Sequence, residues 1–102
     1  MKKLLTGAIA AFAMTGAAHA ADDVTLQLKW VTQAQFGGYF AALENGFYDD
    51  EGLNVTIKPG GPDVAPVQVL MGGGADVMVD WMPSALAARE QGAPVVNIAQ
   101  PF

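Results

Sequence analysis

Segments with strand-like and helix-like patterns alternate along the chain, and this alternation restricts the possible folds more than any other feature. Apolar and polar residues alternate with a period of two in some segments, while others are short apolar runs bounded by turn residues. The predicted strands cover residues 24–30, 53–57, 76–79 and 95–99. The predicted helices cover residues 38–45, 66–71 and 83–91, and each is followed by glycine. Residues 47–52 and 59–62 are predicted as connections.

Single helices between successive strands indicate a parallel sheet that is covered on both faces. Because crossovers between parallel strands are right-handed, the predicted fold is a doubly wound α/β sheet. The last predicted strand ends just before Pro101 and Phe102, with no helix after it. We therefore expect residues 21–102 to be an incomplete piece of such a domain.

The first twenty residues have the order of a cleavable export signal. Lys2 and Lys3 precede an apolar run over residues 4–14, and Ala18-His19-Ala20 fits the small-x-small cleavage rule. The apolar run is short for a membrane span, which disfavours an anchor. We expect cleavage after Ala20 and a periplasmic product.

Charge and residue content exclude several classes of function for residues 21–102. The whole chain has a formal net charge of -5, and loss of Lys2 and Lys3 makes the remainder more acidic. Nucleic-acid binding is disfavoured because it needs clustered basic residues. The chain has no cysteine, and its single histidine, His19, leaves with the signal. A zinc site or a Cys or His nucleophile is therefore excluded, and no metal or cofactor is expected.

In open α/β sheets, ligands bind outside the carboxyl ends of the strands. The ends of the predicted strands and the segments after them hold both tryptophans of the chain, the amides of Gln33 and Gln35, and the carboxylates of Asp63 and Asp80. The predicted ligand-binding residues are Trp30, Gln33, Gln35, Phe36, Gly61, Asp63, Asp80, Trp81 and Ser84. Strand alternation suggests that Lys29 and Lys58 point elsewhere. Aromatic faces with a few polar groups suit a flat polar heterocycle and disfavour an oxyanion.

Six of these residues also have a structural interpretation. Trp30 could pack in the core, because large aromatic side chains are common there. Asp80 could cap the helix predicted at 83–91, and Asp63 could cap the one predicted at 66–71. Gln33 and Gln35 could be ordinary surface residues. A turn explains Gly61 better than a phosphate loop does, since the Gly-Lys-Ser/Thr signature is missing.

Several motifs of residues 29–92 resemble those of the NMT1/THI5-like (SsuA/THI5) family. They are Lys29-Trp30-x-x-Gln33-Ala34-Gln35-Phe36-x-Gly38-Tyr39, Gly46-Phe47-Tyr48-x-x-Glu51-Gly52-Leu53-x-Val55, Pro59-Gly60-Gly61-Pro62-Asp63, Gly74-Ala75-Asp76 and Ser84-Ala85-Leu86-Ala87-Ala88-Arg89-Glu90-x-Gly92. The resemblance implies a type II periplasmic-binding-protein-like fold, of which residues 21–102 form the N-terminal part, in the first lobe only. It also implies a monomeric solute-binding component that delivers a small molecule to an ABC permease at the inner membrane. The first and third motifs are similar to those of the branch that binds pyrimidine precursors of thiamine, or riboflavin.

Three alternatives remain open at this point. The same family includes a thiamine pyrimidine synthase, an enzyme that uses a pyridoxal phosphate lysine, a histidine and a cysteine-rich iron motif. Residues 21–102 contain no His or Cys, so a binding protein is favoured over an enzyme. Other members import sulfonate-type or nitrate-type anions. The chain could also be a degenerate fragment that never folds.

Overall fold

The structure is a computed structural model that describes residues 19–101. The predicted export signal therefore lies almost entirely outside the described residues. In chain order the elements are β1 (Asp22–Gln27), η1 (Ala34–Phe36), α1 (Gly37–Glu44), α2 (Phe47–Asp50), β2 (Leu53–Lys58), α3 (Pro66–Met71), β3 (Val77–Met78) and α4 (Met82–Glu90). In the described part of the chain, no helix is long and apolar enough to cross a bilayer.

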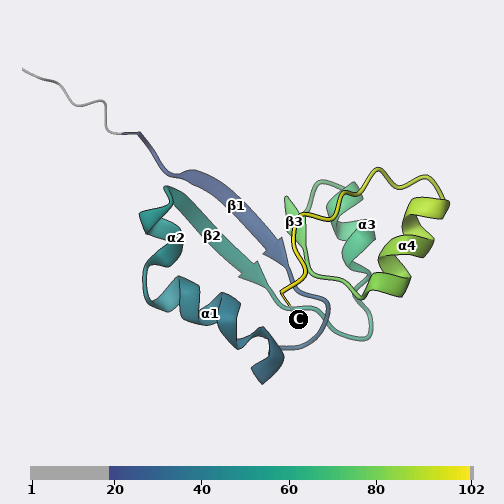
Figure 1. Ribbon diagram of the computed structural model, residues 1–102, viewed down its shortest axis with the longest axis horizontal. Coiled ribbons are helices and arrows are strands. Elements are labelled where there is room, and N and C mark those ends of the chain that lie inside the picture. Colours follow the sequence, from purple (N-terminus) through teal and green to yellow (C-terminus); the bar gives the residue numbers. More distant parts are fainter. Residues whose placement is uncertain (1–18, 102) are drawn as a thin grey trace, which may run out of the picture.

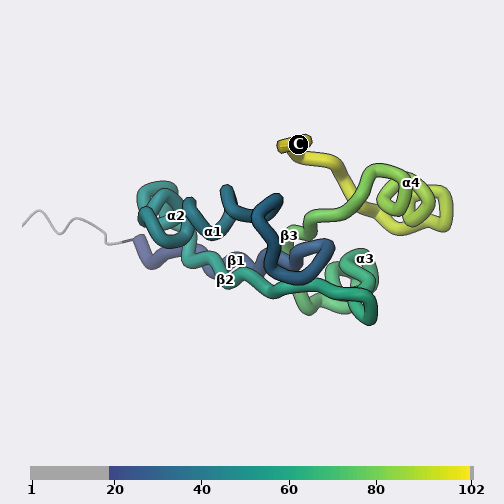
Figure 2. Tube along the Cα trace, turned by 90° about the horizontal axis from the view of Figure 1, so that it is seen from below, coloured from purple at the N-terminus to yellow at the C-terminus, as the bar shows by residue number. Residues whose placement is uncertain are grey.

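The three strands form one parallel sheet in the order β2-β1-β3, which confirms the predicted fold class (Figure 1). β1 pairs with β2 from Asp22↔Leu53 to Gln27↔Lys58, whereas β3 pairs with β1 only at Leu26↔Val77 and Gln27↔Met78. Figure 2 shows α1 and α2 on one side of the β1–β2 pair and α3 on the other. This small α/β unit is consistent with part of a periplasmic-binding-protein-like domain.

The strand order also fixes where a ligand site belongs. The strand that follows β1 in the chain, β2, pairs with one edge of β1, and the next strand, β3, pairs with the opposite edge. β1 and β3 are thus neighbours whose connections run in opposite directions, which defines the topological switch point of the sheet. The residues that follow Gln27 and Met78 therefore lie at the place where such folds bind ligands.

The glycines that follow the helices confirm the predicted helix ends. α1 ends at Glu44 with Asn45 as its C-cap, and Gly46 follows at a φ of 75°, in the left-handed region that glycine adopts readily. The chain then forms the short helix α2, where the sequence predicted a connection. Asp49 and Asp50 lie in the first turn of α2, where negative charge favours the helix amino terminus.

The prediction of a strand at 95–99 is wrong, because the described part of the chain forms no strand there. Instead of joining a ladder, its polar groups bond locally: Arg89 Nη1 donates to the Val95 carbonyl, and Ala99 N donates to Asn97 Oδ1 at 3.1 Å. Ile98 remains 77% exposed, so the apolar run buries little surface. An apolar run forms a strand only where a neighbouring strand offers a partner, and β3 itself has just two paired residues.

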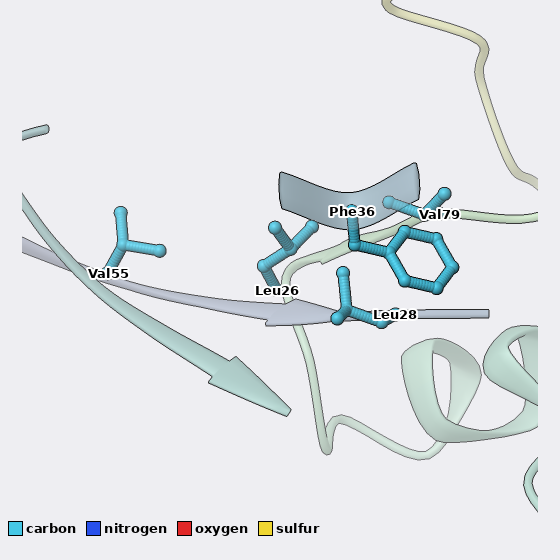
Figure 3. Close-up of a cluster of buried hydrophobic side chains, with 5 residues drawn as sticks. All are labelled: Leu26, Leu28, Phe36, Val55 and Val79. Carbon is cyan, nitrogen blue, oxygen red and sulfur yellow. The ribbon is translucent and has the colours of Figure 1, made fainter. Parts of the chain in front are cut away.

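The core lies between the sheet and the segment that follows β1 (Figure 3). Its fully or nearly buried apolar residues are Leu26, Leu28, Phe36, Val55 and Val79. Phe36 is 0% exposed and belongs to the short 3-10 helix η1, not to a strand. Its ring lies 6.5 Å from that of Tyr39, measured between centroids. The structure thus encloses the Phe36 ring in the core, and contact of this residue with ligand stays a prediction.

The turn after β2 approaches the end of β1 closely. Gly60 N donates to Trp30 O at 2.9 Å, and a Cβ atom at Gly60 would lie 2.4 Å from Leu28 O. Only glycine leaves room for the backbone at this distance. Gly60 therefore allows the ends of β1 and β2 to lie close together, at the edge of the sheet where the candidate site lies.

Candidate functional site

An ion pair bridges the carboxyl ends of β1 and β3. Lys29 follows β1 and Asp80 follows β3, and Lys29 Nζ lies 2.8 Å from Asp80 Oδ1. The Asp80 side chain is 4% exposed and that of Lys29 17%. This pair spans the switch point and corrects the prediction that Lys29 points away from the site.

The Asp80 carboxylate receives two further hydrogen bonds from its own segment. Trp81 N donates to Asp80 Oδ1 at 2.8 Å, and Ser84 Oγ lies 2.6 Å from the same oxygen. Ser84 Oγ is also 2.9 Å from Trp81 O. Trp81 is the N-cap residue of α4 and has no side-chain cap bond, so Asp80 binds the backbone just before the helix begins. These contacts fix the position of Asp80 Oδ1, and Asp80 is not itself the N-cap residue of α4.

A cavity of about 400 Å³ lies next to this ion pair. One wall is the start of α3 and the residues before it, and the other is the face of α4 that carries Ser84. Its lining residues are Lys29, Ala65, Pro66, Val67, Gln68, Asp80, Ser84, Ala87, Ala88, Gln91 and Ala93. Lys29 and Asp80 are the charged residues in this set, so its formal charge is zero. Small apolar side chains form most of the wall, with two amides and one hydroxyl as polar groups.

The two tryptophans follow the same two strands but do not line this cavity. Trp30 is 36% exposed and Trp81 is 39% exposed, and neither belongs to the core. The interpretation of Trp30 as a core residue is therefore wrong. Both rings remain partly open to a ligand at the carboxyl edge of the sheet.

The other predicted residues lie outside the cavity as well. Gln33 and Gln35 are exposed and bond to each other, with Gln35 Nε2 donating to Gln33 Oε1 at 3.0 Å. Asp63 is exposed and does not cap α3, whose N-cap Ala65 has no side-chain cap bond. Gly61 is buried in the turn between β2 and α3. The structure brings Asp80 and Ser84 together and leaves these four residues apart from them.

A family model described as NMT1/THI5-like matches residues 33–102. The chain belongs to the NMT1/THI5-like family. A formylaminopyrimidine-binding protein from Halalkalibacterium halodurans is 30% identical to it over 80 residues. That alignment covers 78% of this chain and 24% of the relative, so the chain spans about a quarter of the length of the curated relative it matches.

One polar residue of this NMT1/THI5-like chain was missed by the sequence reasoning. Gln27, at the end of β1, is 2% exposed. Its Nε2 donates to Leu28 O at 3.0 Å and to Pro59 O at 3.1 Å, and lies 3.4 Å from Lys58 O. The buried amide thus ties the turn after β2 to the end of β1. The available signal was its position in a sheet covered on both faces, where polar residues of an alternating strand are also buried.

A larger cavity of about 570 Å³ lies between β3, α4 and residues 94–98. Its wall is mainly apolar and includes Met78, Met82, Leu86 and Ile98. Among the predicted site residues, Asp80 alone lines it. Residues 94–98 have no regular structure, so the smaller cavity at the switch point is the better-built candidate. The described residues contain no group of three or more His, Cys, Asp or Glu side chains placed to hold a metal ion.

Proposed function

We propose that this chain belongs to the solute-binding component of an ABC importer that captures a pyrimidine-type heteroaromatic. The observation that carries the proposal is its 30% identity to a formylaminopyrimidine-binding protein. Binding without catalysis is favoured over the synthase activity found in the same family, because residues 21–102 contain no His or Cys. The ABC permease is the proposed partner.

The cavity at the switch point supports a small uncharged ligand. Its volume of about 400 Å³ lies near the lower end of the usual range for ligand pockets, roughly 300–1,000 Å³. This size favours a single-ring pyrimidine over the larger flavin system of riboflavin. The Lys29–Asp80 pair balances the charge of the wall, which suits a neutral ring better than a sulfonate or a nitrate ion. Trp30 and Trp81 offer aromatic faces nearby, which suit stacking on a heterocycle.

We expect Trp30→Ala and Trp81→Ala each to weaken pyrimidine binding by about tenfold or more. Loss of an aromatic anchor commonly costs 2 kcal/mol or more, and about 1.4 kcal/mol corresponds to a factor of ten. Isothermal titration of the purified protein with formylaminopyrimidine, riboflavin, taurine and nitrate measures both the ligand class and the loss. Phe47→Ala is a matched control, since Phe47 is 58% exposed and belongs to α2. Figure 1 shows α2 beside the start of β2, away from the carboxyl edge of the sheet. Tight binding of taurine or nitrate, with no response to the pyrimidine, would contradict the proposal.

We also propose that the protein acts in the periplasm after removal of residues 1–20. The basis is the sequence order of Lys2 and Lys3, an apolar run and the Ala18-His19-Ala20 site. Edman sequencing of the periplasmic protein is expected to begin at Ala21. A cytoplasmic product that retains Met1 would overturn this part of the proposal.

A further inference from the structure

The charge balance of the cavity at the switch point depends on the Lys29–Asp80 pair. Asp80 supplies its negative charge and Lys29 its positive charge, at a separation of 2.8 Å. The remaining lining residues carry no charge. Removal of the Lys29 charge would leave a carboxylate that is 4% exposed without a cationic partner. Such an uncompensated buried charge is strongly unfavourable until a cation or a proton replaces the missing partner.

The bonds to Asp80 are distributed unevenly between its two oxygens. Lys29 Nζ, Trp81 N and Ser84 Oγ all approach Oδ1, at 2.8, 2.8 and 2.6 Å. Among the hydrogen bonds within residues 19–101, none reaches Oδ2 of Asp80. Oδ1 is thus occupied by the protein, while Oδ2 receives no hydrogen bond from the described residues and belongs to a residue that lines the cavity.

We propose that Lys29 determines the charge specificity of this site, so that it selects a neutral N–H donor over a cation. This inference rests on the proposed function. Lys29 acts through Asp80: its ammonium group cancels the carboxylate charge and holds Oδ1, while Oδ2 accepts a hydrogen bond from a ring or exocyclic N–H. A neutral aminopyrimidine provides such a donor and adds no charge to the cavity. A cationic ligand would lose hydration on entry and would meet no unpaired anion to compensate for that loss.

The proposal predicts a change in selectivity and not only in affinity. Suitable probes are 4-aminopyrimidine, which is neutral at neutral pH, and 4-aminopyridine, which is a cation there and differs by one ring atom. Binding of each probe is measured by NMR titration, following the indole N–H signals of Trp30 and Trp81. The wild-type protein should prefer the neutral probe. Lys29→Met should shift the ratio of the two dissociation constants toward the cation by about tenfold or more, which corresponds to about 1.4 kcal/mol.

Two further variants separate charge from packing. Lys29→Arg keeps the positive charge, and the selectivity should stay close to that of the wild type. The double variant Lys29→Met, Asp80→Asn removes both charges, and it should return the selectivity toward the neutral probe. Because the double variant has no unpaired buried charge, it provides the test even if Lys29→Met alone fails to fold.

The outcomes distinguish this inference from the function on which it rests. A purely structural role of Lys29 would weaken both probes equally, and an unchanged ratio in Lys29→Met would overturn the inference alone. A double variant that prefers the cation would overturn it as well. A wild-type protein that binds neither probe nor formylaminopyrimidine would overturn the proposed function, and this inference with it.

Discussion

Replacement of Phe36 by Ala is expected to lower the free energy of unfolding by about 3–5 kcal/mol. The ring is 0% exposed and packs against Leu26, Leu28 and Val79 in the core (Figure 3). Truncation removes the burial of a large aromatic side chain and leaves a cavity that the short strands can fill only in part. Domains are stable by roughly 0.05–0.15 kcal/mol per residue, so a loss of this size approaches the lower end of the total stability expected for a chain of this length.

Urea denaturation followed by tryptophan fluorescence measures the effect. Phe47→Ala is the matched control, because it makes the same chemical change at a side chain that is 58% exposed. We expect the control to change the free energy of unfolding by less than about 1 kcal/mol. Equal losses in the two variants would show that Phe36 is not the centre of the core.

The parts of the fold that depend on local pattern were predictable from the sequence. The period-two alternation found β1 and β2, which the structure places at Asp22–Gln27 and Leu53–Lys58. The glycine after each helix marked its end, as Gly46 illustrates with its φ of 75°. The parallel sheet followed from the order of the elements. For the strands and the helix ends, neighbouring residues alone carry the signal, because backbone preferences and amphipathic patterns are local properties.

The absence of a strand at 95–99 from the described residues and the enclosure of Phe36 could not be predicted in this way. A strand at 95–99 requires a partner, and which segment provides one is a property of the whole fold. Phe36 follows β1 by a few residues, so the rule that ligands bind after strands placed it in the site. Whether an aromatic ring after a strand turns inward or outward depends on the free volume of the core, which local sequence does not specify.

The site was predictable in location but not in electrostatics. The position of Asp80 and Ser84 after a buried strand followed from the strand-end rule, and the structure places them 2.6 Å apart through Ser84 Oγ and Asp80 Oδ1. The direction of Lys29 was inferred from strand alternation, which holds only while the chain remains in the ladder. β1 ends at Gln27, two residues earlier, so the alternation no longer fixes the direction of Lys29. The pairing with Asp80 therefore became visible only in three dimensions.

Gln27→Glu is expected to destabilise the protein by about 3–5 kcal/mol at neutral pH. Gln27 is 2% exposed, and its Nε2 donates to Leu28 O and Pro59 O. A carboxylate of nearly the same shape has no hydrogen to donate. It would place a buried negative charge against these carbonyl oxygens and against Lys58 O, which lies 3.4 Å from Nε2. The substitution removes the hydrogen bonds by which this amide joins the ends of β1 and β2, at the carboxyl edge of the sheet.

The destabilisation should decrease as the pH is lowered, and the sign follows from proton binding. Burial raises the pKa of the introduced carboxyl group above the usual value of about 4.3 for Glu. Between these two pKa values the folded variant binds more protons than the unfolded chain, so its stability falls as the pH rises. Above the raised pKa the penalty is complete, and below about 4.3 only the loss of one donor remains.

Urea denaturation of variant and wild type across this pH range measures the difference. The control is Gln33→Glu, at an exposed residue whose side-chain oxygen accepts from Gln35 and would still do so as a carboxylate. A destabilisation by Gln27→Glu that does not change with pH, or that Gln33→Glu matches, would show that the buried amide does not hold the two strand ends together.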